Sequence, residues 1–176
     1  MNEPTVRLMH YDPRWRQEFE QTKSSILSSC EGTVTAVEHI GSTAISGLIA
    51  RPTIDVIAGV ETFAVIETAA LLIEGLNFRR GSPPEWFKNG VVLRKPRHLH
   101  DSAPEPTHCV YLTVRQSTEW TRATRLRDHL RDNPPTAIQF ETAKVRRWRS
   151  GLGDLVQYES DKAIFLSHLL DQIQFA

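Results

Sequence analysis

Apolar and polar residues alternate along the first third of the chain in a pattern typical of a mixed α/β fold. Asp12-Pro13 predicts the start of a helix, because apolar residues recur at helical spacing from there to about residue 29. The β-branched residues of 34–40 predict a strand that runs into a tight turn. Segment 53–60 is almost continuously apolar, as expected of a strand covered on both faces. Asp55 interrupts it and is therefore a candidate functional residue.

The remaining sequence predicts further helices and strands within the same unit. These elements are helix 62–74, a short strand at 91–94, a strand at 108–114, and helices at 118–131, 136–149 and from about residue 160. Residues 77–107 contain five prolines and two glycines, which predicts mainly irregular structure. No internal repeat or linker divides the sequence. We therefore expect a single domain over residues 1–176 with an α/β (α+β) fold.

Composition and charge narrow the function classes. The 176 residues are 40% apolar and 24% charged, which is typical of a globular protein. The 21 lysines and arginines balance the 21 aspartates and glutamates, so we expect neither nucleic acid nor membrane as a partner. The N-terminus has no apolar stretch typical of a secretory signal, and we expect a cytoplasmic protein. Cys30 and Cys109 form no Cys-x-x-Cys pair, so we expect both to be packing residues.

Gly41-Ser42 and Asp55 are the first candidates for chemistry. Asp55 follows Ser42 by thirteen residues, a spacing used by nucleotidyltransferases of the polymerase-β type. A glycine lets backbone amides approach an anion closely, and a serine hydroxyl can add a hydrogen bond. A carboxylate on the neighbouring strand can then hold a divalent ion against the phosphate. Gly-Ser alone is a weak indication, because it is far more often an ordinary turn.

A longer string is more specific. HIGSTAISGLIARPTIDV, from His39 to Val56, closely resembles the pattern of GrpB-like proteins (UPF0157), whose usual form is HIGSTAVPGLxAKPxIDI. Further agreements cover nearly the whole chain in the same order: Tyr11-Asp12-Pro13-x-Trp15 with Phe19, Leu126–Arg131 beside the family's FRDYLR, and Tyr158 with Lys162. The resemblance implies a nucleotidyltransferase-like fold, a mixed β-sheet packed with helices. It also implies a domain that occurs fused to dephospho-CoA kinases, but it implies no established activity.

The sequence departs from the family pattern at several positions. Ser46 replaces the family's proline, and Arg51 replaces its lysine with a planar guanidinium that suits phosphate. The family's strand motif T-H-x-x-H begins at Thr107 and His108 here, but its second histidine is Tyr111. This exchange weakens the case for a site in which two histidines hold a metal.

The second metal carboxylate is missing. Active transferases of this type place two acids at i and i+2 of a strand, where alternate residues share a face and can jointly hold Mg²⁺. Here Asp55 is position i, and position i+2 is Ile57, whose side chain cannot bind a metal. His39 and His108 are candidates to complete a site, and a His/Asp/His set would suit a transition metal better than magnesium.

Our leading hypothesis from the sequence is a nucleotidyltransferase-like enzyme for a nucleotide or related phosphorylated metabolite. The proposed phosphate-binding residues are Gly41, Ser42, Thr43, Arg51, Arg127 and Lys162. Asp55 would hold a divalent cation, Mg²⁺ or Mn²⁺, with His39 or His108 as acid or base. The alternative is a noncatalytic module that binds a nucleotide or a CoA precursor, or another protein, after losing the second acid. The sequence leaves the substrate, acceptor, metal, oligomeric state and protein partners open.

Simpler structural roles stand beside these assignments. Asp55 can accept backbone hydrogen bonds or pair with Arg51, since a buried carboxylate needs a partner. His39 can be a hydrogen-bonded core histidine. Lys144 and Lys162 are expected at the surface.

Overall fold

The computed structural model describes residues 6–98, 105–151, 154 and 168–173. Within them, one mixed sheet contains β1 (Val34–Ile40), β2 (Ile54–Val60), β3 (Arg79–Gly81), β4 (Gly90–Lys95) and β5 (His108–Val114). The strand order is β1-β2-β5-β4-β3. Strands β2 and β5 are parallel, and the other neighbouring strands are antiparallel. Strand β1 therefore forms one edge of the sheet, beside the strand that carries Asp55.

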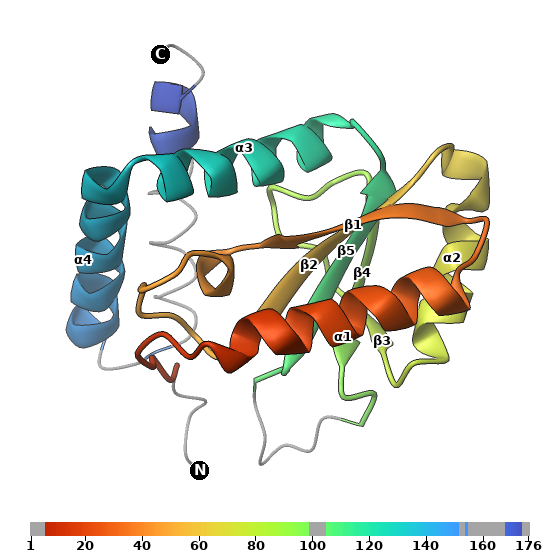
Figure 1. Cartoon of the computed structure of the whole chain (residues 1–176), viewed down its shortest axis with the longest axis horizontal. Coiled ribbons are helices and arrows are strands. Elements are labelled where there is room, and N and C mark those ends of the chain that lie inside the picture. Colours follow the sequence, from red (N-terminus) through yellow and green to blue (C-terminus); the bar gives the residue numbers. More distant parts are fainter. Residues whose placement is uncertain (1–5, 99–104, 152–153, 155–167, 174–176) are drawn as a thin grey trace.

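Helices pack on both faces of the sheet. They are α1 (Arg14–Ser29), α2 (Ile66–Glu74), α3 (Thr118–Asp132) and α4 (Pro134–Ser150), with short 3₁₀ turns η1 (Ser42–Ala44) and η2 (Phe63–Val65). Residues 168–173 are also helical. In Figure 1, α1 and α3 lie on opposite sides of β1, and α4 stands at the end of the sheet nearest η1. The chain thus folds as a single mixed α+β domain.

The main core lies between the sheet and helices α1 and α2. Alternate residues of a strand face the same way, so one face of β2 presents a row of apolar side chains to these helices. That row and the helix residues packed on it are fully or almost fully buried: Ile54, Val56, Ala58, Val60, Phe19, Ile26, Ala69 and Ile73. Complete burial of one Val, Ile or Phe side chain stabilises a fold by about 1.5–3 kcal/mol. This face therefore anchors α1 against the edge strand.

Aromatic residues and helix α3 cover parts of the opposite face. Trp120 of α3 packs so closely on Gly59 that a Cβ there would lie 2.9 Å from the indole ring. Trp86, Phe87 and Tyr111 form a cluster with ring centroids 4.9 to 5.3 Å apart. Because residues at odd positions of β2 share this face with Gly59, Asp55 and Ile57 lie on it too.

The elements predicted from the sequence are confirmed, with corrections at their ends. Helix 62–74 begins with η2, so α2 starts at Ile66. Pro134 ends one helix and begins α4, two residues before the predicted start, because proline fits the first helical position. Strand β3 was not predicted. Of the helix expected from about residue 160, only 168–173 fall within the described residues.

Gly41 brings the turn after β1 into close contact with Asp55. Its φ of +74° lies in the left-handed region that favours glycine. A Cβ at this position would lie 2.7 Å from Asp55 Oδ2 and 3.2 Å from Asp55 Cβ. The glycine is therefore required both by the backbone conformation and by the space that the carboxylate occupies.

We expect Gly41→Ala to destabilise the protein more than Gly47→Ala. Gly47 has a similar φ of +85°, but a Cβ there would have no neighbour within 4 Å. Both variants carry the left-handed penalty of about 1–2 kcal/mol, and only Gly41→Ala adds the clash with Asp55. Urea unfolding of the two variants measures the difference, which we expect to be at least about 1 kcal/mol. Equal losses would show that Asp55 moves away without strain.

Candidate functional site

The turn after β1 is held from α4 by a buried lysine. Lys144 Nζ donates to Ser42 Oγ and to the Ile49 carbonyl oxygen, both at 2.7 Å. The side chain is only 2% exposed, and its ammonium lies 4.7 Å from the centroid of the Phe140 ring. Both ends of segment 42–49 are thereby fixed to one helix.

Glu141 completes this attachment one turn away. Its Oε2 accepts the Ile49 amide at 2.6 Å.

The sequence-based expectation of a surface position for Lys144 is wrong. The run Lys144-Val-Arg-Arg-Trp-Arg is mostly basic, so it resembles a solvated face, but helical geometry turns this one lysine toward the 42–49 segment.

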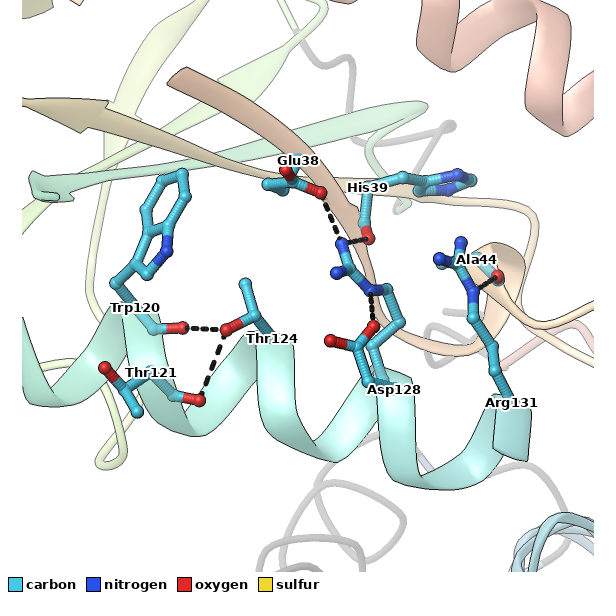
Figure 2. Close-up of polar contacts among 9 residues, drawn as sticks. Glu38, His39, Ala44, Trp120, Thr121, Thr124, Asp128 and Arg131 are labelled. Atoms are coloured by element: carbon cyan, nitrogen blue, oxygen red, sulfur yellow. Dashed lines mark hydrogen bonds and ion pairs between the residues drawn. The ribbon is translucent and has the colours of Figure 1, made fainter. Parts of the chain in front are cut away.

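Helix α3 holds the same region through arginines (Figure 2). Arg127 donates from one terminal nitrogen to Glu38 Oε2 at 2.6 Å and to the His39 carbonyl at 3.1 Å. Its Nε donates to Asp128 Oδ1 at 2.8 Å. Arg131 Nε donates to the Ala44 carbonyl at 3.0 Å. Helix α3 is thus attached to both β1 and η1.

Glu38 lies opposite Ile57, the position at which active transferases carry their second acid. In the antiparallel register Glu38 is the partner of Ile57, and Ile40 is the partner of Asp55. Directly paired residues of antiparallel strands share a face, so a carboxylate is present beside Ile57 on the Asp55 face. However, Arg127 forms an ion pair with this carboxylate. Its charge is thus already balanced by a fixed cation.

The two candidate histidines lie on the other face of the sheet. His39 is the register partner of Val56, and His108 is the partner of Ile54, so both project toward the α1 side. Asp55 projects the opposite way. The structure therefore does not bring these three side chains together. Among the residues that the structure describes, no group of three or more His, Cys, Asp or Glu side chains could hold a metal ion.

Other predicted site residues make contacts within the fold. Arg51 Nε lies 3.3 Å from Glu105 Oε1, and the side chain of Arg51 is 18% exposed. His108 Nδ1 is 2.8 Å from Thr107 Oγ1. Burial, followed by the positive charge of Lys95, lowers the pKa of His108 to about 4. Lys162 lies outside the described residues.

His39 is a buried, neutral histidine at the inner end of a cleft. Its ring stacks on Phe19 with centroids 4.7 Å apart, and Nε2 is 2.9 Å from Thr43 Oγ1. Burial is the main cause that lowers its pKa to about 4, and Arg131 and Arg127 add to the effect. Thr43 Oγ1 donates to the Thr53 carbonyl at 3.4 Å, so it can accept the Nε2 proton of His39. This arrangement leaves Nδ1 as an acceptor.

The cleft itself is a cavity of about 770 Å³ along the edge strand. Helix α1 forms one wall, segment 43–48 the floor, and the facing ends of α3 and α4 the other wall. Arg16, Lys23 and Arg131 line it, together with Glu20. Neither terminal nitrogen of Arg131 contacts a hydrogen-bond acceptor among the described residues, and Arg16 forms no ion pair with a described carboxylate.

The arginines of this cleft are close enough to affect one another. Burial lowers the pKa of Arg131, and the charge of Arg127 lowers it further, whereas Asp128 and Glu38 raise it; Arg16 on the facing helix adds a smaller lowering effect. Like charges that converge across a concave surface form a natural site for an anion. Sequence reasoning selected Arg127 from the FRDYLR-like segment and missed Arg131, four residues along the same helix. It also missed Arg16, because only the fold brings α1 opposite α3.

Comparison with known proteins gives the family. The family model described as GrpB protein matches residues 5–172. The chain belongs to the GrpB family.

Relatives and a solved structure agree with this membership. The UPF0157 protein BH1888 of Halalkalibacterium halodurans is 30% identical over 81% of this chain and 68% of its own length. The glutamate-rich protein GrpB of Alkalihalophilus pseudofirmus is 23% identical over 98% of both chains. The crystal structure of the conserved protein GrpB from Enterococcus faecalis has a TM-score of 0.80 and 25% identity, covering 95% of this chain and 96% of that chain. The fold is therefore that of a GrpB protein.

No helix within the described ranges of this GrpB-family chain combines the length and apolar character needed to cross a bilayer.

We expect the stability of the protein to fall between pH 6.5 and pH 4 because of His39. A histidine whose folded pKa is about 4 takes up its proton mainly in the unfolded state within this range. Its contribution is therefore complete above pH 6.5 and is lost as pH falls to about 4, amounting to about 3 kcal/mol. Urea unfolding at several pH values, compared with His39→Gln, measures it. An identical pH dependence in both proteins would contradict the assignment.

Proposed function

We propose that this protein binds a nucleotide or another phosphorylated small molecule, such as a CoA precursor, in the cleft between α1, η1, α3 and α4. In this proposal it acts as a binding module and needs no metal. The observation that carries the proposal is that Arg16 of α1 and Arg131 of α3 line the same cavity. Guanidinium groups suit phosphate because they present several donors in a fixed plane.

The balance of charge in the cleft supports an anionic ligand. Three carboxylates line the cavity, but Glu38 is paired with Arg127, and Glu141 accepts a backbone amide. Glu20 and Glu141 keep their negative charges, but three further cations line the same cavity, Arg16, Lys23 and Arg131, so the lining carries four cations against three carboxylates. A bound phosphate would relieve the repulsion between the arginines and gain charge-assisted hydrogen bonds.

Titration calorimetry with pyrophosphate, ADP and AMP tests this binding without added metal. We expect Arg16→Met to weaken the binding of each anion by about tenfold, because it removes a charged donor. Arg16 is a better position to substitute than Arg131, because Arg131 Nε donates to the Ala44 carbonyl, whereas the Arg16 side chain makes no hydrogen bond among the described residues. Arg125→Met is the matched control, because Arg125 is an exposed residue of α3 that does not line the cavity. The proposal fails if none of the three anions binds, or if the two variants weaken binding equally.

The second candidate is metal-assisted nucleotidyl transfer on the opposite face of the sheet. It is favoured by the contact between Gly41 and the Asp55 carboxylate, which places an acid beside the Gly41-Ser42 turn. Ser42, Arg51, Arg127 and Lys162 would bind the phosphates. Asp55 would hold Mg²⁺ or Mn²⁺, and His39 or His108 would have to act from the other face. Within the part of the chain that the structure describes, the carboxylate beside Ile57 is not available to this candidate, since Glu38 is bound by Arg127.

Asp55→Asn separates the two candidates. If the protein is a binding module, wild type releases no pyrophosphate from nucleoside triphosphates with Mg²⁺ or Mn²⁺, and the variant binds AMP as tightly as wild type does. Transfer instead predicts pyrophosphate release by wild type that falls by at least about 100-fold in the variant, because the metal ligand is lost. Circular dichroism of the variant checks that the fold is retained.

A further inference from the structure

The two walls of the cleft differ in chemistry. On α1 the wall presents cations and ring atoms, including Arg16, Lys23 and Phe19. On α4 it presents Pro134, Ala137 and Ile138. Glu141, the remaining α4 residue that lines the cavity, accepts the Ile49 amide. The α1 wall is therefore mainly charged, and the α4 wall is mainly apolar.

Ile138 is the exposed residue of this apolar α4 wall. It is 61% exposed, although the neighbouring apolar residues that line the cavity are buried: Ile45, Leu48, Leu130 and Ala137. These four residues belong to one apolar cluster with Phe140 and Leu169. A large apolar side chain on a concave wall, next to such a cluster, gains free energy when a ligand removes it from water.

Arg131 lies next to the apolar cluster and lines the same cavity as Arg16. Its Nε is fixed to the Ala44 carbonyl, and Leu130 beside it in the chain lies in the apolar cluster. An anion held by Arg131 and Arg16 would therefore have an apolar surface within the same cavity. A cavity of about 770 Å³ lies within the range of 300–1,000 Å³ typical of small-molecule sites, which is larger than a bare phosphate requires.

Resting on the function proposed above, we infer that the cleft selects phosphate monoesters that carry an apolar or planar group. The phosphate lies between Arg16 and Arg131, and the apolar group covers Ile138. A nucleoside monophosphate and an alkyl phosphate share this chemistry, whereas inorganic phosphate and ribose 5-phosphate lack the apolar part. Ile138 is thus a specificity-determining residue, and Arg16 and Arg131 set the requirement for an anion.

Four probes separate these contributions in titration calorimetry on the full chain: AMP, ribose 5-phosphate, adenosine and hexyl phosphate. We expect AMP to bind at least about tenfold more tightly than ribose 5-phosphate, because the base adds apolar contact. Adenosine should bind more weakly than AMP by a similar factor, since it lacks the charge. Comparison of hexyl phosphate with AMP shows whether the apolar group is an alkyl chain or a planar base.

Ile138→Ser is the decisive variant. It should weaken the binding of AMP, or of hexyl phosphate, by roughly fivefold and leave ribose 5-phosphate unchanged, because only the apolar contact is lost. Leu71→Ser is the matched control, since Leu71 is 64% exposed on α2 and lies outside the cleft. Both residues are exposed, so neither change is expected to unfold the protein, and thermal melting checks this.

The outcomes distinguish this inference from the function on which it rests. If ribose 5-phosphate binds as tightly as AMP and hexyl phosphate, or if Ile138→Ser weakens all anions equally, the selectivity for an apolar group is overturned while anion binding stands. If no phosphate compound binds, the proposed function itself fails. If AMP and ribose 5-phosphate differ and Ile138→Ser removes that difference, the inference is supported.

Discussion

The buried ammonium of Lys144 is the constraint on which the cleft depends. Removing a charge from water is unfavourable by several kcal/mol unless hydrogen bonds compensate, so the groups around it must be placed accurately. Two acceptors of this ammonium, Ser42 Oγ and the Ile49 carbonyl, lie at the two ends of the segment that forms the floor of the cleft. Satisfying this charge fixes α4, and with it the apolar wall, against the floor of the cleft, together with the Glu141 contact and the apolar cluster.

Most of the fold could be predicted from the sequence because its signals are local. Continuous apolar character identified β2, and Asp12-Pro13 identified the start of α1. Strand β3 escaped prediction because it has only three residues, Arg79–Gly81, and none of them is buried. The start of α2 was predicted at residue 62, but the helix begins at Ile66. Thr62 has the residue type of a helix cap, but its side chain makes no capping hydrogen bond and a 3₁₀ turn follows it.

The site could be predicted only in part, because its residues come from distant segments. Gly41 and Asp55 were identified by a contiguous motif, and the structure places them in contact. The pairing of Glu38 with Ile57 depends on the register between β1 and β2, which the sequence does not state. Likewise, Arg16 and Arg131 are 115 residues apart in the sequence, and only the packing of α1 and α3 along the edge strand brings them to the same cavity.

The electrostatics of this end of the sheet favour the binding of an anion over the capture of a metal. A divalent cation is held by accumulated negative charge, usually several carboxylates that have no other partner. Here the carboxylate beside Ile57 is paired with Arg127 at 2.6 Å, so a metal would have to displace a fixed guanidinium. An anion in the cleft would meet Arg131, which the Ala44 carbonyl already holds in place, and Arg16 on the facing wall. Preorganised charge of this kind stabilises a phosphate without the reorganisation that a metal would require.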